Sequence, residues 1–118
     1  MKRIDLHIHT HHSDATLTVA EVAKRAHRER IIAGICDHLS PYHNLYGPGP
    51  FDAYVADVRK HRGLLLGAEC CFGVEPPVDR ERLAELDYLM GAVHSITSAG
   101  VNYFIWGESA PTDLNAII

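Results

Sequence analysis

The chain has 118 residues, the size of one domain, and 47% of them are hydrophobic, as in ordinary globular proteins. Its formal net charge of −4 provides no overall positive field of the kind that favours nucleic-acid binding. No hydrophobic run reaches the roughly 20 residues of a membrane-spanning helix. The odd set of cysteines (Cys36, Cys70 and Cys71) contains no Cys-x-x-Cys motif, so we expect a reduced, cytoplasmic protein without a structural cysteine–zinc site.

The first predicted element is a β-strand, because hydrophobic and polar residues alternate from Ile4 to His9. His7 and His9 would then lie on one face, with Cα atoms roughly 6–7 Å apart, so that both imidazoles can reach one metal ion. The polar loop over residues 10–16 adds three ligand-type side chains: His11, His12 and Asp14. A lone histidine pair is more often a surface feature, but nine histidines in 118 residues favour a metal site.

A helix is predicted next, because Thr18 and Glu21 fit a capping box and hydrophobic residues recur at helical spacing as far as Ala26. Basic residues gather in the same segment, between Lys24 and Arg30. They could form a phosphate- or nucleic-acid-binding patch. Such a run is more often the solvent-exposed face of an amphipathic helix, and we favour that interpretation.

Three further hydrophobic runs, over residues 31–36, 64–68 and 88–93, predict buried strands. Each is followed by side chains that can bind metal or move protons: Asp37 and His38, then Glu69, then His94. Polar residues at the carboxyl ends of buried strands are typical of barrel enzymes.

The connections between these strands predict helices. A loop over residues 39–50, rich in proline, precedes a helix over 51–62, and Asp79 can cap a short helix before the last strand. His43 in that loop either contacts substrate or is simply exposed. Residues 100–118 are ambiguous: 101–106 could be strand or helix, and Thr112 could cap a final helix.

The order strand, polar residue, loop, helix therefore recurs along the chain. Buried strands joined by helices predict an α/β fold with parallel strands and right-handed crossovers. Four such βα units are half of an eight-unit barrel, so the fold class expected is α/β, related to the TIM barrel.

Six side chains are predicted to meet at one rim of this sheet: His7, His9, Asp14, His38, Glu69 and His94. Imidazole and carboxylate ligands suit zinc, manganese or iron. Six groups exceed the needs of one tetrahedral ion, and a carboxylate can bridge two ions, so we expect a multinuclear centre. The cysteines beside these ligands are predicted to be packing residues rather than ligands.

Four motifs resemble those of the PHP superfamily, named for polymerase and histidinol phosphatase. They are His-x-His-Thr-x-x-Ser-Asp at 7–14, Gly-Ile-Cys-Asp-His at 34–38, Gly-Ala-Glu at 67–69 and Val-His-Ser at 93–95. Their order and spacing match along residues 3–95. The resemblance implies a distorted (βα)7 barrel, a centre of up to three divalent ions and phosphoesterase activity, with residues 1–118 as one PHP domain.

The resemblance also implies roles for individual residues. His7 and His9 would hold one ion, Asp14 and His38 another, Glu69 would bridge ions, and His94 would serve the remaining ion. Glu69, Asp37 and His38 are the predicted catalytic residues, and His12 and His43 the predicted contacts to a phosphorylated small-molecule substrate.

The chain departs from the family after His94, where no further histidine occurs. Family members continue with another histidine and an Asp-x-His pair, so each ion would lack one protein ligand here. We therefore expect an N-terminal portion of a PHP domain, with an open sheet edge that favours self-association. Less favoured is a barrel completed by two copies of the chain.

The leading functional prediction is a metal-dependent phosphomonoesterase of histidinol-phosphatase type. A nuclease or proofreading module of the kind attached to bacterial DNA polymerases is the second, and the net charge of −4 argues mildly against it. A third is a metal-binding or interaction module without catalysis. Neither a membrane nor a nucleic acid is an expected partner.

Overall fold

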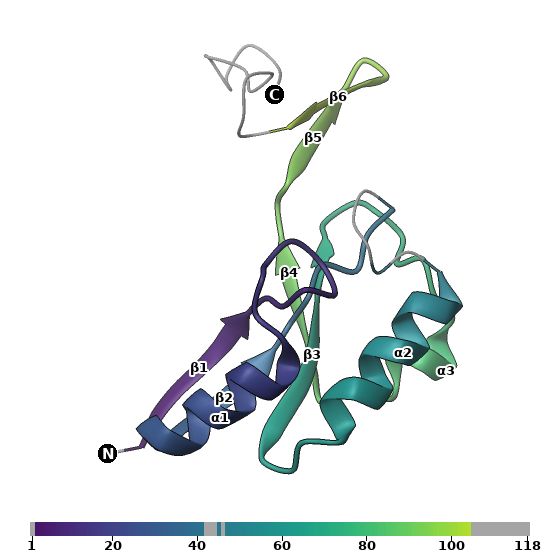
Figure 1. Ribbon diagram of the computed structural model, residues 1–118. Helices are drawn as coiled ribbons and strands as arrows, with labels where there is room; N and C mark the ends of the chain where they lie inside the picture. The colour runs from purple at the N-terminus through teal and green to yellow at the C-terminus, as the bar shows by residue number, and fades with distance from the viewer. Residues whose placement is uncertain (1, 42–44, 46, 105–118) are drawn as a thin grey trace.

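A four-stranded parallel sheet is the centre of the structure, a computed structural model that describes residues 2–41, 45 and 47–104. The strands lie in chain order: β1 (Arg3–Ile8), β2 (Ile31–Ile35), β3 (Leu64–Cys71) and β4 (Tyr88–Ala92). The connecting helices are α1 (Val19–Glu29), α2 (Pro48–Arg59) and α3 (Arg80–Leu83). The sheet is curled like part of a barrel wall (Figure 1). The predicted α/β class with parallel strands joined by helices is therefore confirmed.

The first two helices show how local sequence sets their ends. The predicted capping box is present on α1: the Thr18 hydroxyl accepts a hydrogen bond from the Glu21 amide, and the Glu21 carboxylate accepts one from the Thr18 amide. Helix α2 begins at Pro48, earlier than predicted. Pro48 and Pro50 both fit its first turn, where backbone N–H groups have no partner within the helix, so the predicted 39–50 loop is too long.

The core lies between the sheet and its helices. Strands β2 and β3 turn Ala33, Ile35, Leu66 and Ala68 toward buried residues of α1 and α2, among them Val19, Val22, Phe51, Tyr54 and Val58. Burying a large hydrophobic side chain of this kind contributes roughly 1.5–3 kcal/mol. Helix α3 is joined to α2 at the surface, where Arg82 contacts Asp52 at 2.8 Å.

Tyr88 of β4 lies across two glycines of its neighbours. A Cβ atom at Gly34 or Gly67 would collide with the Tyr88 side chain, so the missing side chains leave room for this ring. The Tyr88 hydroxyl donates a hydrogen bond to the Leu6 carbonyl oxygen at 2.7 Å, although the two residues lie on strands at opposite ends of the sheet order. The ring therefore spans the sheet from β4 to β1 and supports its curvature.

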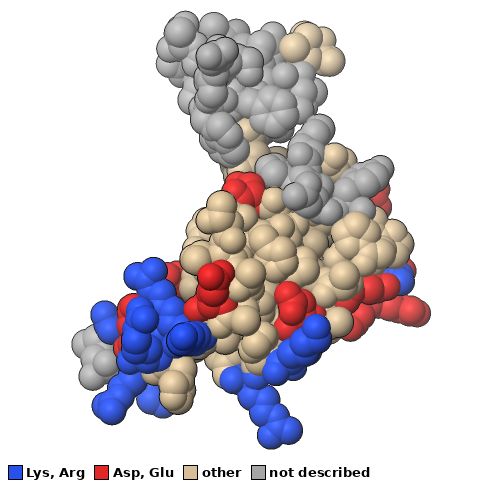
Figure 2. All heavy atoms as spheres, in the orientation of Figure 1, with Lys and Arg blue, Asp and Glu red and all other residues tan. Residues whose placement is uncertain are grey.

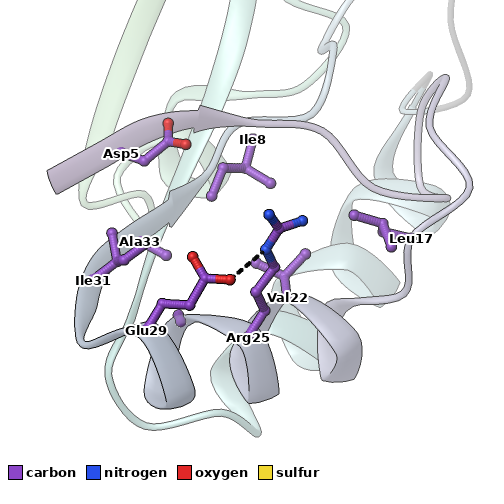
Figure 3. Close-up of a pocket in the computed structure, with 9 residues that line it drawn as sticks. Asp5, Ile8, Leu17, Val22, Arg25, Glu29, Ile31 and Ala33 are labelled. Carbon is purple, nitrogen blue, oxygen red and sulfur yellow. Dashed lines mark hydrogen bonds and ion pairs between the residues drawn. The ribbon is translucent and has the colours of Figure 1, made fainter. Parts of the chain in front are cut away.

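The alternation predicted for β1 holds for His7 and His9, which both contact Glu69, but the strand contains an irregularity. Its register against β2 shifts between Asp5 and Ile8, as at a β-bulge, and both side chains line the cavity between β1 and α1 (Figure 3). Leu6 lies near Gly34 and Tyr88 instead. Alternation from Ile4 to His9 would place Leu6 and Ile8 on one side of the strand, but Ile8 packs against the core and Leu6 lies on the other side. The extra residue of a bulge reverses the side to which the following residues point.

After β4 the chain forms an antiparallel hairpin, β5 (Ser95–Ser98) and β6 (Val101–Phe104), which projects away from the sheet and helices (Figure 1). Residues 101–104 are therefore strand, and the suggested helix after Thr112 lies outside the described residues. Within the part of the chain that is described, β1 and β4 each pair with one neighbour in the main sheet, so both have an open edge. None of the described helices is long and apolar enough to cross a membrane.

The basic residues of α1 and its C-cap residue, Arg30, are exposed to solvent, as predicted. Lys24, Arg25, Arg28 and Arg30 are all exposed, and Arg25 and Arg28 contact the Glu29 carboxylate. Figure 2 shows Lys and Arg side chains gathered at the lower left, over the region where Figure 1 draws α1. Because β2 starts directly after α1, this basic end lies by the amino ends of the strands, away from their carboxyl ends.

Candidate metal centre

Four imidazoles and one carboxylate meet at the carboxyl edge of the parallel sheet. His7 belongs to β1 and His9 follows it, His38 comes three residues after β2, and His94 comes two residues after β4. Glu69 lies within β3, which continues to Cys71 rather than ending at Ala68 as predicted. Parallel strands place all their carboxyl ends at one edge, which is why residues distant in sequence gather here.

The Glu69 carboxylate is the centre of this cluster. Its Oε2 atom lies 3.0 Å from Nε2 of His9, 3.2 Å from Nδ1 of His38 and 3.4 Å from Nε2 of His7. Its Oε1 atom lies 3.2 Å from Nε2 of His94. Only 4% of the Glu69 side chain is exposed. A buried carboxylate is costly unless it is paired, and here four histidines surround it.

The donor geometry fits shared coordination better than hydrogen bonding. Nε2 of His9 and Oε2 of Glu69 are both buried and 3.0 Å apart, yet neither makes a hydrogen bond of acceptable geometry among the described residues. One donor atom each from His9, His38 and Glu69 falls within 4.8 Å of the others. Ligands bound at about 2.0–2.2 Å from one ion lie roughly 3–3.5 Å apart, which matches these separations. The residues therefore fit a divalent transition metal.

Asp14 contacts the outer nitrogens of two of these histidines. Its carboxylate lies 2.9 Å from Nδ1 of His9 and 3.2 Å from Nε2 of His38. Burial acts to raise the pKa of Asp14, but the hydrogen bond with His9 and the proximity of His38 outweigh it, so the pKa is lowered. The carboxylate can orient both rings, or it can hold an ion together with His38.

Asp37 is not part of the imidazole cluster. Its buried carboxylate accepts hydrogen bonds from the Thr10 amide and hydroxyl, both at 2.6 Å, and from the Ser13 hydroxyl at 2.5 Å. It thereby holds the loop between β1 and α1 against the end of β2. Thr10 and Ser13 had no role in the prediction from sequence. Their hydroxyl groups, spaced through a short polar loop, could have indicated that the loop is held by hydrogen bonds.

Cys36 is buried beside the cluster. Its Sγ atom lies within 4.8 Å of donor atoms of His7 and His9. Burial and the nearby Glu69 charge raise the pKa of the Cys36 thiol to about 12, and the same two causes raise the pKa of Cys70. A neutral buried thiol behaves as a small hydrophobic group. That Cys36 is a packing residue stays a prediction.

Of the two predicted substrate contacts, His12 and His43, the structure describes only His12. His12 lies outside the cluster around Glu69 and contacts the Asp57 carboxylate of α2 at 2.9 Å. His43 lies outside the described residues. Within the described chain, the structure thus brings together His7, His9, Asp14, His38, Glu69 and His94. It places Asp37 against Thr10 and Ser13, and His12 against Asp57.

The chain matches none of the protein-family models, curated proteins or solved structures with which it was compared. Its function therefore has to be inferred from the side chains at the carboxyl edge of the sheet and from the motifs that carry them.

Proposed function

We propose that the chain is a metal-dependent phosphoesterase of the PHP type that hydrolyses a phosphate monoester of a small molecule. Its described strands would form part of the distorted (βα)7 barrel of that superfamily. The observation that supports this most directly is the buried Glu69 carboxylate, which lies within 3.0–3.4 Å of four imidazoles. Such a concentration of nitrogen and oxygen donors at one edge suits zinc, manganese or iron.

The residues divide into ligands and supports. His7, His9, His38, Glu69 and His94 would hold the ions, with Glu69 shared between them. Bound ions of this kind neutralise phosphate oxygens and activate water as the nucleophile. Asp14 holds the rings of His9 and His38 in place through their outer nitrogens, and Asp37 holds the loop that carries Asp14.

The position of each ligand suggests the side from which substrate enters. His7 has 54% of its side chain exposed, whereas His38 and His94 have 8% and 10%. The inner ligands are therefore shielded, and the cluster opens to solvent at His7. A phosphate group arriving there would meet His7 before the buried members of the cluster.

Hydrolysis of a chromogenic phosphate monoester, with manganese or zinc added, tests this function. We expect weak turnover above the background of the metal alone, and a loss of up to about 100-fold in Glu69→Gln, because displaced ions lose the geometry that the reaction needs. Glu75→Gln is the matched control, since Glu75 is exposed. Metal uptake without hydrolysis would favour a non-catalytic metal-binding module, and cleavage of single-stranded DNA without monoester hydrolysis would favour a nuclease.

Metal content distinguishes the bridging residue from a terminal ligand. Glu69→Gln should lower the number of ions bound per chain more than His94→Ala does, because Glu69 contacts four imidazoles and His94 contacts one oxygen of Glu69. Elemental analysis after dialysis measures this. Equal losses in the two variants would contradict a shared carboxylate.

A further inference from the structure

A second group of metal-type donors lies outside the cluster around Glu69. His11 and His12 come from the loop after β1, and Asp57 comes from α2. One donor atom of each falls within 4.8 Å of the other two. We propose that these three side chains form a separate, solvent-facing site for a divalent transition metal such as zinc.

The distances within this group suit shared ligation. Nε2 of His12 and Oδ2 of Asp57 are 2.9 Å apart and share a hydrogen bond. An ion bound at about 2.0–2.1 Å from both atoms would replace this hydrogen bond once they moved apart by a few tenths of an ångström. The rings of His11 and His12 have centroids 4.4 Å apart and planes tilted by 38°, so the two imidazoles lie side by side. Two imidazoles and a carboxylate are a donor set that zinc accepts, with water as a fourth ligand.

The backbone that carries the two histidines is already held in place. The His11 amide donates a hydrogen bond to the Leu17 carbonyl oxygen at 2.9 Å, which closes the loop on itself. Asp37 binds Thr10 and Ser13 on either side of the pair. Little backbone conformational entropy therefore remains to be lost when an ion binds.

Tyr54 of α2 packs against one of the two histidines. Its ring lies against His12, with centroids 5.4 Å apart, and its hydroxyl is within 3.1 Å of the Ile35 carbonyl oxygen and 2.7 Å of that of Gly67. Tyr54 is fully buried and its hydroxyl is held by these carbonyl oxygens, so its ring can orient the His12 imidazole, as second-layer contacts do at metal sites.

The exposure of its side chains makes the site accessible to an ion, and a nearby lysine lowers the affinity that we expect for that ion. His12 and Asp57 keep 16% and 28% of their side chains exposed, and His11 is exposed, so an ion and its waters can enter. Lys60 lies 3.7 Å from Oδ1 of Asp57 and competes with a cation for that carboxylate. Its side chain is 70% exposed and can turn into solvent when an ion arrives.

An ion at this site would link the loop after β1 to α2. The same loop carries Asp14, which contacts His9 and His38 of the cluster around Glu69. Binding would therefore restrain the loop without supplying a ligand to the other centre. The proposal does not depend on phosphoesterase activity.

Zinc binding to the intact 118-residue chain tests the proposal. Bound zinc is counted by elemental analysis after dialysis against a series of buffered zinc concentrations, for the native chain and for His11→Ala/Asp57→Asn. We expect the double variant to lose one ion per chain, or to bind that ion at least about tenfold more weakly. The matched control is His27→Ala/Glu81→Gln, which removes one exposed histidine and one exposed carboxylate elsewhere.

A third variant, His7→Ala/His9→Ala, separates this site from the cluster around Glu69. It should retain the ion that His11→Ala/Asp57→Asn loses, even if the native cluster binds no metal at all. Zinc should also slow hydrogen exchange of the amides of residues 11–17 in this variant. Unchanged zinc binding in His11→Ala/Asp57→Asn, or an equal loss in the matched control, would overturn the proposal.

Discussion

Replacing Asp37 tests whether this residue acts by holding a loop or by taking part in the chemistry. Its carboxylate is fully buried and accepts three hydrogen bonds from Thr10 and Ser13, at 2.5–2.6 Å. In Asp37→Asn the side-chain carbonyl can still accept hydrogen bonds at the Oδ1 position, but the amide group at the Oδ2 position cannot accept the hydrogen bond that the Thr10 hydroxyl donates. The loop that carries Asp14 should therefore loosen.

The expected cost follows from the hydrogen bonds. A hydrogen bond to a charged group contributes about 1.5–3 kcal/mol, so Asp37→Asn should lower the free energy of unfolding by about 2–3 kcal/mol. Asp37→Ala leaves all three donors without this acceptor and should cost about 3–5 kcal/mol. Asp52→Asn is the control, because Asp52 makes an exposed ion pair with Arg82 whose loss should cost less than about 1 kcal/mol.

Urea unfolding followed by circular dichroism measures these differences, and hydrogen exchange locates them. The amides of residues 10–17 should exchange faster in Asp37→Asn under native conditions, while those of β3 should change little. If Asp37→Asn costs no more than Asp52→Asn, the loop-holding role is refuted. If it abolishes hydrolysis at full stability and full metal content, the catalytic role predicted from the sequence is supported instead.

Three further predictions concern packing, the thiol and pH. Gly67→Ala should lower the free energy of unfolding by about 1–3 kcal/mol in urea, because the new Cβ meets the Tyr88 ring. If the Cys36 thiol only packs, elemental analysis should find as much metal bound to Cys36→Ser as to the native chain. Loss of metal from a folded Cys36→Ser variant would show that the thiol is a ligand. Arg59 lowers the pKa of Asp87, so the charged carboxylate stabilises the fold above about pH 4, and this is lost as pH falls through the lowered pKa. Urea unfolding between pH 3 and 6 should therefore depend less on pH in Asp87→Asn.

The order of elements could be predicted from the sequence because it depends on local patterns. Alternating hydrophobic and polar residues indicated β1, and short hydrophobic runs bounded by polar residues indicated the other three strands of the main sheet. The Thr18–Glu21 capping box located the start of α1. The carboxyl-edge cluster followed from the same patterns, since parallel strands bring their ends together regardless of the sequence between them.

Local patterns were less reliable predictors where the same residues are common in two different conformations. Pro48 and Pro50 indicated a loop, although proline is equally suited to the first turn of a helix, and α2 begins there. The alternation from Ile4 to His9 did not reveal the shift in register between Asp5 and Ile8, because a bulge depends on the pairing with β2.

Only the tertiary structure assigned partners to the polar side chains. The sequence placed Asp37 beside His38, and both were predicted to be catalytic. In the structure Asp37 accepts three hydrogen bonds from Thr10 and Ser13, which lie 27 and 24 residues away in the chain. His12 and Asp57 are 45 residues apart in the chain, and the fold likewise brings them within hydrogen-bond distance. The sequence by itself determined which donors the chain possesses and at which edge of the sheet most of them lie. Their grouping into a centre around Glu69 and a second group at Asp57 required the folded chain, because hydrogen bonds and metal coordination depend on atomic positions within a few tenths of an ångström.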